Sequence, residues 1–125
     1  MSVLIVDDQV PFRSAARTVV SLAPGFKVVQ EAADGQAAVD AVEQERPAVV
    51  LMDINMPNVD GIEATRRIVD AHPETVVILL STYAANDLPD EARSCGAVAY
   101  VHKEDFSPTV LRTAWEEHRP GGTGQ

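Results

Sequence analysis

Short apolar runs alternate along the chain with longer stretches in which apolar residues recur every three or four positions. An uninterrupted apolar run of four or five residues is typical of a strand buried on both faces, and the longer spacing is typical of a helix. By these signals the sequence predicts strands over residues 3–6, 26–29, 49–52, 76–80 and 98–101. It predicts helices over residues 11–23, from an N-cap at Asp34 to a stop at Pro47, and over residues 62–71, about 86–95 and 107–118.

Five strand–helix units therefore follow one another, with no sequence repeat and no internal linker. Alternating strands and helices, with strands that are apolar on both faces, favour an α/β fold with a doubly wound parallel sheet. In such sheets, ligands bind beyond the carboxyl ends of the strands, where the strand order reverses. We expect the functional residues at this edge of the sheet.

Polar side chains follow four of the five predicted strands. Asp7 and Asp8 follow the first strand, and Asp53 follows the third. Ser81 follows the fourth strand and Lys103 follows the fifth. Because parallel strands all end at the same edge, these residues can share one site although they are far apart in the chain.

The chemistry of this group indicates a cation and a phosphoryl group. Carboxylates about 4 Å apart repel by about 4 kcal/mol per pair at an effective dielectric of 20. A hard cation such as Mg²⁺ removes that repulsion and suits one or two carboxylates plus a phosphoryl oxygen. Lys103 can then serve as a point charge for the phosphoryl group, and the Ser81 hydroxyl as a hydrogen-bond donor. Since aspartate can form an aspartyl-phosphate, we assign the nucleophile to Asp53, on the third and predicted central strand.

Three segments together resemble the receiver domain of two-component response regulators. They are VLIVDD (residues 3–8), LMDINMPNVDG (residues 51–61) and YVHK (residues 100–103). Within DGIEATRR (residues 60–67), the pattern is most similar to the NarL/FixJ subfamily. The resemblance extends from residue 2 to about residue 118, and it depends on the ordered set rather than on any single segment.

The resemblance implies a CheY-like, flavodoxin-like (βα)5 fold with strand order 2-1-3-4-5. It implies that Asp53 accepts a phosphoryl group from the phosphohistidine of a sensor histidine kinase. By the same resemblance Asp8, Asp53 and the backbone carbonyl of Asn55 bind Mg²⁺, with Mn²⁺ as the alternative ion. Asp7 assists through a water molecule. Such a domain catalyses only its own phosphorylation and dephosphorylation, so we do not expect a turnover enzyme.

The resemblance also implies a conformational switch. Ser81 matches the family's switch hydroxyl, Tyr100 its switch aromatic, and Lys103 its site lysine. In the family the hydroxyl moves toward the phosphoryl group, and the aromatic turns inward behind it. Asn55 and Tyr83, each two positions beyond a site residue, flank the expected path of the hydrolytic water, and we expect them to tune the phosphoryl lifetime.

Two residues depart from the family pattern. Ser81 stands where threonine is commoner, so the hydroxyl is retained but a packing methyl is lost. Glu104 follows Lys103 where many receivers have proline, so the cis peptide bond usual at that point is not expected here.

Composition and charge narrow the function further. The 125 residues include 46% hydrophobic and 23% charged residues, which fits one globular domain. A net charge of −9 argues against direct binding to nucleic acid or to an anionic membrane. The single cysteine, Cys95, excludes an internal disulfide and a multi-cysteine metal site. No apolar run approaches the ~20 residues of a membrane span and no basic leader is visible, so we expect a cytoplasmic location.

The domain organisation and the partners follow from these observations. Residues 1–118 are predicted to form the receiver domain. Residues 119–125 are predicted to be a flexible tail or the start of a linker to a covalent effector domain, which in NarL/FixJ relatives is usually a DNA-binding helix-turn-helix. The expected partners are the sensor histidine kinase and, on phosphorylation, a second copy of the chain.

Other interpretations of the same residues remain open. The fold could act as a docking module that works without phosphorylation. A flavodoxin-like cofactor carrier has the same architecture, but the chain lacks a phosphate-cradling loop after the first strand. Asp7 and Asp8 could simply cap the first helix, Lys103 could be a surface charge, and Tyr100 could be passive packing.

Overall fold

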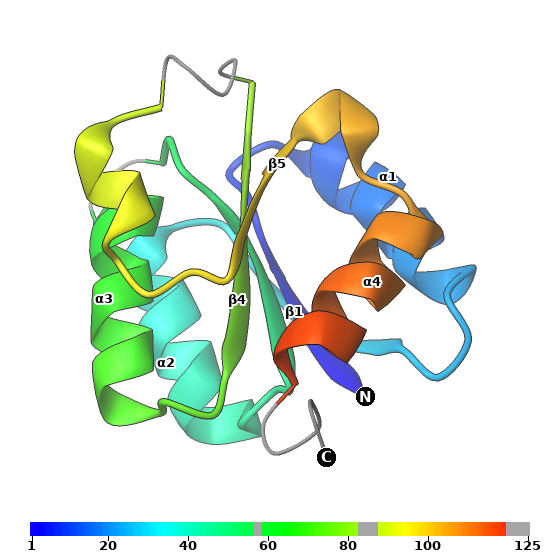
Figure 1. Ribbon diagram of the computed structural model, residues 1–125, viewed down its shortest axis with the longest axis horizontal. Coiled ribbons are helices and arrows are strands. Elements are labelled where there is room, and N and C mark those ends of the chain that lie inside the picture. Colours follow the sequence, from blue (N-terminus) through cyan, green and yellow to red (C-terminus); the bar gives the residue numbers. More distant parts are fainter. Residues whose placement is uncertain (57–58, 83–87, 120–125) are drawn as a thin grey trace.

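The computed structural model describes residues 1–56, 59–82 and 88–119. In these ranges five parallel strands form one sheet in the order β2-β1-β3-β4-β5 (Figure 1), as the sequence predicts. The strands are β1 (Ser2–Val6), β2 (Lys27–Ala32), β3 (Val49–Asp53), β4 (Val76–Ser81) and β5 (Ala99–His102). The strand order reverses between β1 and β3, which places the expected site at the carboxyl ends of these two strands.

Helices cover both faces of the sheet (Figure 1). Helices α2 (Gly35–Glu45) and α3 (Gly61–Ala71) lie on one face, and helices α1 (Val10–Ser21) and α4 (Pro108–His118) lie on the other. Two short 3-10 helices, η2 (Asp90–Arg93) and η3 (Lys103–Asp105), flank β5. None of the helices in the described ranges has both the length and the apolar character needed to cross a membrane. The doubly wound, CheY-like fold class is confirmed.

Two separate hydrophobic cores result from the alternation of side chains along each strand. On β1, Leu4 and Val6 face the core under α2 and α3, whereas Val3 and Ile5 face the core under α1 and α4. All four side chains are at most 1% exposed. Every residue of β3 and β4 is likewise buried, because these strands are covered on both faces. This double burial explains why the central strands read as continuous apolar runs in the sequence.

Side-chain caps define where three of the helices begin. The Asp34 carboxylate accepts a hydrogen bond from the Ala37 backbone N–H at 2.8 Å, which confirms the expected N-cap of α2. Ser107 caps α4 in the same way through the Val110 N–H at 3.1 Å, with Pro108 at the first helical position. Asp60 caps α3, the helix that follows the Asp53 strand. Each cap satisfies a backbone donor that the helix itself leaves unpaired.

One predicted helix is wrong and one predicted strand is too short. In place of an α-helix over about 86–95, the described residues 88–95 contain only the four-residue η2, while residues 86 and 87 lie outside the described ranges. Pro89 is extended (ψ 144°) and its ring disfavours helical backbone at Leu88, so no regular helix runs through this point. The strand expected over 26–29 extends to Ala32, because β2 is an edge strand that tolerates the polar pair Gln30 and Glu31.

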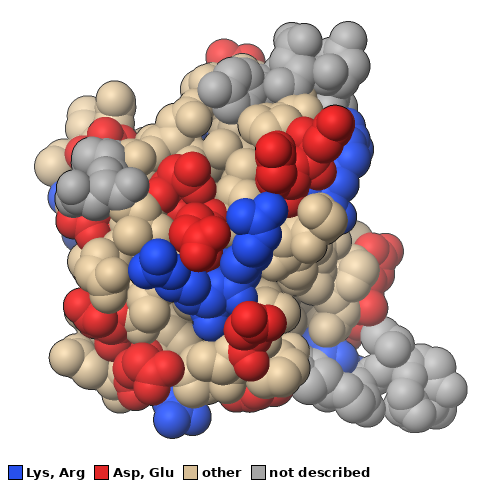
Figure 2. Space-filling model, turned by 90° about the vertical axis from the view of Figure 1, so that its left-hand side faces the viewer, with Lys and Arg blue, Asp and Glu red and all other residues tan. Residues whose placement is uncertain are grey.

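The side of the molecule formed by α3 and η2 carries basic side chains with acidic ones beside them (Figure 2). On α3, Glu63 pairs with Arg66 at 3.4 Å and with Arg67 at 3.1 Å, one helical turn away. Exposed pairs of this kind contribute only a few tenths of a kcal/mol each.

Candidate functional site

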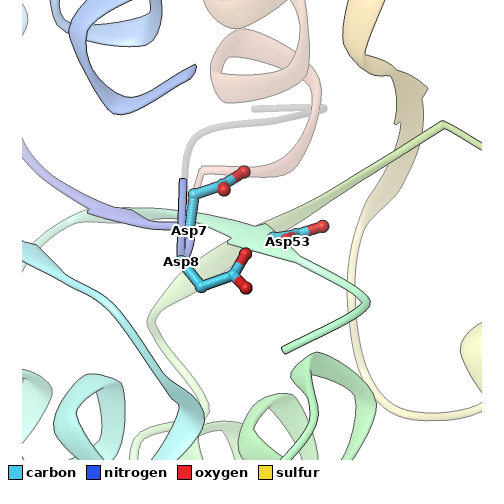
Figure 3. A group of neighbouring side chains, drawn as sticks. All are labelled: Asp7, Asp8 and Asp53. Atoms are coloured by element: carbon cyan, nitrogen blue, oxygen red, sulfur yellow. The ribbon is translucent and has the colours of Figure 1, made fainter. Parts of the chain in front are cut away.

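Three carboxylates meet at the carboxyl ends of β1 and β3 (Figure 3). Because β1 and β3 are paired in parallel, with Val6 opposite Met52, the next residue on each strand brings Asp7 beside Asp53. Asp8 follows directly, and one carboxylate oxygen from each of the three residues lies within 4.8 Å of the other two. The tertiary structure thus assembles the acidic group that the strand-end argument predicts.

Burial differs among the three carboxylates. Asp7 is fully buried and Asp53 is 5% exposed, whereas Asp8 is exposed to solvent. Burial, and after it the neighbouring Asp7 charge, raise the pKa of Asp53 to about 6 against the opposing effect of the Lys103 ammonium. Asp53 is therefore ionised near neutral pH, although its surroundings disfavour the negative charge. A bound cation or phosphoryl partner would offset this unfavourable energy.

Lys103 reaches this group from the start of η3, directly after β5. Its Nζ donates a hydrogen bond to Asp7 Oδ2 at 2.6 Å and lies 3.5 Å from Asp53 Oδ1. The ammonium is therefore shared by two carboxylates, and its shorter contact is with Asp7 rather than with the predicted acceptor. The Lys103–Glu104 peptide is trans, as expected from the missing proline.

The Asp7 carboxylate already has protein partners on both oxygens. Oδ1 accepts the Gln9 backbone N–H at 2.8 Å, and Oδ2 accepts the Lys103 ammonium. The backbone of Asp7 is held as well: its N–H donates to Ala32 O at 3.0 Å, and its carbonyl accepts Arg13 Nη1 at 2.6 Å. Asp7 is thus the most constrained of the three acids, which suits the indirect, water-mediated role expected for it better than direct ligation.

Two residues of α1 belong to the site although the sequence did not single them out. Arg13 supports Asp7 and also pairs with Glu31 of β2, with Nε 3.2 Å from Oε1. The Phe12 ring lies against Lys103, with 4.6 Å between its centroid and Nζ. The only sign of their role in the sequence is that they lie in the first helical turn after the acidic pair. Helical spacing does not show in which direction such side chains point.

The start of α3 packs tightly against the end of β3. The Gly61 N–H donates to Ile54 O at 2.9 Å, and the Asn55 N–H approaches Asp53 Oδ1 at 3.4 Å. A side chain at Gly61 would place its Cβ 2.0 Å from the Asp53 carbonyl oxygen. Glycine is needed here because two backbones approach closely, which anchors the start of α3 to β3.

The predicted switch residues lie on the next two strands. Ser81 ends β4, is 4% exposed and is paired with His102 of β5. Tyr100 of β5 is half-buried against the core beneath α2 and α3. Both line a hollow of about 390 Å³ that Ile54 also borders. Asn55 is exposed beside Asp53, whereas Tyr83 lies outside the described residues.

The donor set fits a hard divalent cation. Oxygens bound to Mg²⁺ at about 2.0–2.1 Å are about 3 Å apart when adjacent and about 4 Å apart when opposite. Three carboxylate oxygens within 4.8 Å of one another need only a small closure to reach that geometry. Asp8 and Asp53 are the acids best placed to hold such an ion, because Asp7 is already engaged by Lys103 and Gln9.

Comparison with known proteins decides the family. Residues 3–116 match the response regulator receiver domain family. The chain belongs to this family. The receiver is 38% identical to the transcriptional regulatory protein DegU of Brevibacillus brevis over 104 residues, which cover 83% of the chain and 44% of DegU. It spans about half the length of the transcriptional regulators that it matches.

Solved structures agree with this assignment. The signal receiver domain of the response regulator NarL from Mycobacterium tuberculosis superposes with a TM-score of 0.80 at 30% identity, covering 90% of this chain and 94% of that one. CheY in the CheX-CheY-BeF3-Mg²⁺ complex from Borrelia burgdorferi gives a TM-score of 0.81 at 26% identity, covering 94% and 87%. The matches to NarL and DegU support the NarL/FixJ type that the sequence indicates, and the receiver resemblance is confirmed.

Proposed function

We propose that this receiver domain is the phosphoacceptor of a two-component system, with Asp53 phosphorylated by a sensor histidine kinase. The observation that carries the proposal is the meeting of Asp53 with two further carboxylates within 4.8 Å and with the Lys103 ammonium at 3.5 Å. A nucleophilic carboxylate, a cation site and a mobile positive charge are the parts that phosphoryl transfer to aspartate needs.

In the proposed transfer, an oxygen of ionised Asp53 attacks the phosphorus of the kinase phosphohistidine. The new O–P bond forms as the P–N bond breaks, and the imidazole leaves with the bonding electron pair and takes up a proton. Because the pKa of Asp53 is raised to about 6, the carboxylate remains ionised at neutral pH while gaining basicity. Lys103 and the Ser81 hydroxyl then neutralise and hydrogen-bond the phosphoryl oxygens.

Mg²⁺, with Mn²⁺ as the alternative, is the proposed cofactor. Asp8, Asp53 and the Asn55 backbone carbonyl are the proposed ligands, and Asp7 is proposed to assist through water. When bound, the ion neutralises the charge that accumulates between the carboxylates and the incoming phosphoryl group. The crystal complex of a related CheY with BeF3 and Mg²⁺ supports this ion choice.

Phosphorylation is proposed to switch a surface that an output domain reads. A phosphoryl group adds about −1.5 to −2 charge, which attracts the Ser81 hydroxyl and the Lys103 ammonium. The hollow shared by Ser81 and Tyr100 is the space in which Tyr100 is proposed to turn inward. Residues 1–118 are the proposed receiver unit, and residues 119–125 a tail or the start of a linker.

The proposed output is a covalent effector domain, of the DNA-binding helix-turn-helix type, with a homodimer formed on phosphorylation. The support is that DegU and similar transcriptional regulators are about twice as long as the segment they share with this chain. The receiver itself acts only on its own Asp53 and binds no nucleic acid directly, in keeping with its net charge of −9.

Incubation with acetyl phosphate and Mg²⁺, followed by intact mass measurement, tests the proposed function. We expect the wild type to gain about 80 Da, the mass of one phosphoryl group. Asp53→Ala should not gain this mass, and Asp40→Ala, which removes an exposed acid of α2, should gain it normally. A wild type that stays unmodified would favour the phosphorylation-independent docking module. Phosphorylation that persists in Asp53→Ala would contradict the assigned acceptor.

Asn55 is proposed to tune the phosphoryl lifetime. Its side chain is exposed next to the acceptor, where its amide can orient the attacking water. We expect Asn55→Ala to slow dephosphorylation by about three- to tenfold, the equivalent of one hydrogen bond, while Asp53 still accepts the group. Loss of the added mass with time after removal of acetyl phosphate measures this rate, and an unchanged decay would contradict the role. The same role stays a prediction for Tyr83.

A further inference from the structure

The Lys103 ammonium contacts both a carboxylate and an aromatic ring. Its Nζ is 2.6 Å from Asp7 Oδ2 and lies over the Phe12 ring, 4.6 Å from the ring centroid. The Lys103 side chain is only 16% exposed, although lysine is usually among the most solvated residues. The ring thus occupies a side of the ammonium that water would otherwise surround.

An aromatic face attracts a cation through the negative charge density above the ring. The attraction grows when the ammonium is partly desolvated, as it is here. Lysine has a flexible four-carbon side chain, so holding its end in one place has an entropic cost that fixed contacts must offset. Asp7 supplies one fixed contact, and Phe12, anchored in the first turn of α1 and packed against the core beneath α1 and α4, supplies the second.

We propose that Phe12 is a positioning residue for Lys103, whose ring face holds the ammonium at the sheet edge before a phosphoryl group arrives. From this place Nζ is 3.5 Å from Asp53 Oδ1, so a small movement along the ring brings it to an oxygen of a group bound on Asp53. The role rests on the proposed phosphoacceptor function, and it gives α1 an indirect part in phosphoryl transfer, through Lys103.

Fluorinated phenylalanines placed at position 12 test the electrostatic part of this role. Each added fluorine withdraws charge from the ring face and changes the shape of the side chain little. We expect the rate of phosphorylation by acetyl phosphate to fall stepwise from one to three fluorines, by about fivefold for the trifluoro residue. The melting temperature should stay constant along the series.

Phe26 provides the matched control for the fluorine series. It is a buried phenylalanine that packs edge-on against Trp115, with 6.4 Å between the ring centroids. The same series at Phe26 should leave the phosphorylation rate unchanged. The proposal would be overturned by a phosphorylation rate that does not change along the Phe12 series, or that falls equally at both positions. Either result would show that the charge of the Phe12 ring face has no specific effect on Lys103.

A second measurement does not depend on phosphorylation. The ε-methylene protons of Lys103 should show an upfield ring-current shift in the NMR spectrum of the wild type, and Phe12→Leu should abolish it. A shift that is absent from the wild type, or that survives in Phe12→Leu, would overturn the placement of the ammonium. Failure of the wild type to gain a phosphoryl group would instead contradict the proposed function, while the NMR result would still decide where Lys103 is held.

Discussion

Gly61→Ala is expected to destabilise the domain by about 3 kcal/mol, more than any surface substitution. The added Cβ would lie 2.0 Å from the Asp53 carbonyl oxygen and 2.8 Å from its carbon. Both atoms belong to the backbone, so no side chain can rotate away to make room. The Gly61 N–H is also bonded to Ile54 O at 2.9 Å, and relieving the clash would pull the start of α3 away from that partner. The position requires the absence of a side chain rather than an unusual backbone conformation.

Urea unfolding with a two-state fit measures this loss, as a lower midpoint at an unchanged slope. Asp70→Ala is the matched control, because Asp70 is exposed near the end of the same helix and the change introduces the same residue. We expect that control to remain within about 0.5 kcal/mol of the wild type. A Gly61→Ala protein as stable as the control would mean that α3 does not begin against β3.

Asp53→Asn is expected to stabilise the domain by about 2 kcal/mol at pH 8 when divalent metal is removed. The carboxylate has an ordinary pKa of 3.8 and a folded-state pKa of about 6, raised first by burial and then by the Asp7 charge. The full difference in pKa, which already includes the attraction of Lys103, corresponds to about 3 kcal/mol, and we expect a smaller gain because the asparagine amide is itself a buried polar group. Removing a charge that is unfavourable in the folded state thus raises the free energy of unfolding.

The direction of the pH dependence follows from proton linkage. The folded state binds the Asp53 proton more tightly than the unfolded state. Below about pH 4 the carboxyl group is protonated in both states and does not lower the free energy of unfolding. Between pH 4 and pH 6 the wild type loses this part of its stability as the pH rises, and the loss is complete above about pH 6. The advantage of Asp53→Asn should therefore be full at pH 8, smaller at pH 5 and absent near pH 4.

Urea unfolding at these pH values in the presence of a chelator gives the measurement, with Asp70→Asn as the exposed control. Adding Mg²⁺ should reduce the difference in stability between Asp53→Asn and the wild type at pH 8, since an ion that binds the folded wild type stabilises it by mass action. An advantage that does not change with pH, or an asparagine variant less stable than the wild type at pH 8, would contradict the unfavourable environment inferred for Asp53.

The core of the fold was predictable because β1, β3 and β4 are buried on both faces and carry continuous apolar runs. Such runs need no tertiary information to be recognised, and their ends agree with the structure to within one residue. Predictions failed where a strand is not buried on both faces, and where a proline prevents a regular helix. Gln30 and Glu31 hid the second half of the edge strand β2, and Pro89 interrupted a stretch whose apolar spacing suggested a helix.

The acidic group of the candidate site was predictable for a topological reason. Asp7, Asp8 and Asp53 each follow a strand, and parallel strands that lie side by side must end at one edge. The sequence by itself therefore determined which carboxylates meet. Their burial, and with it the raised pKa of Asp53, depends on the tertiary structure.

The contacts of Lys103 were decided by the tertiary structure alone. Lys103 and Asp7 are 96 positions apart, and no pattern in the chain indicates that the ammonium approaches Asp7 more closely than Asp53. The approach of the Phe12 ring to that ammonium, and of Arg13 to the Asp7 carbonyl, is equally invisible in the sequence. Periodicity fixes the face of an element on which a residue lies, but the direction of each side chain is set by the tertiary contacts around it.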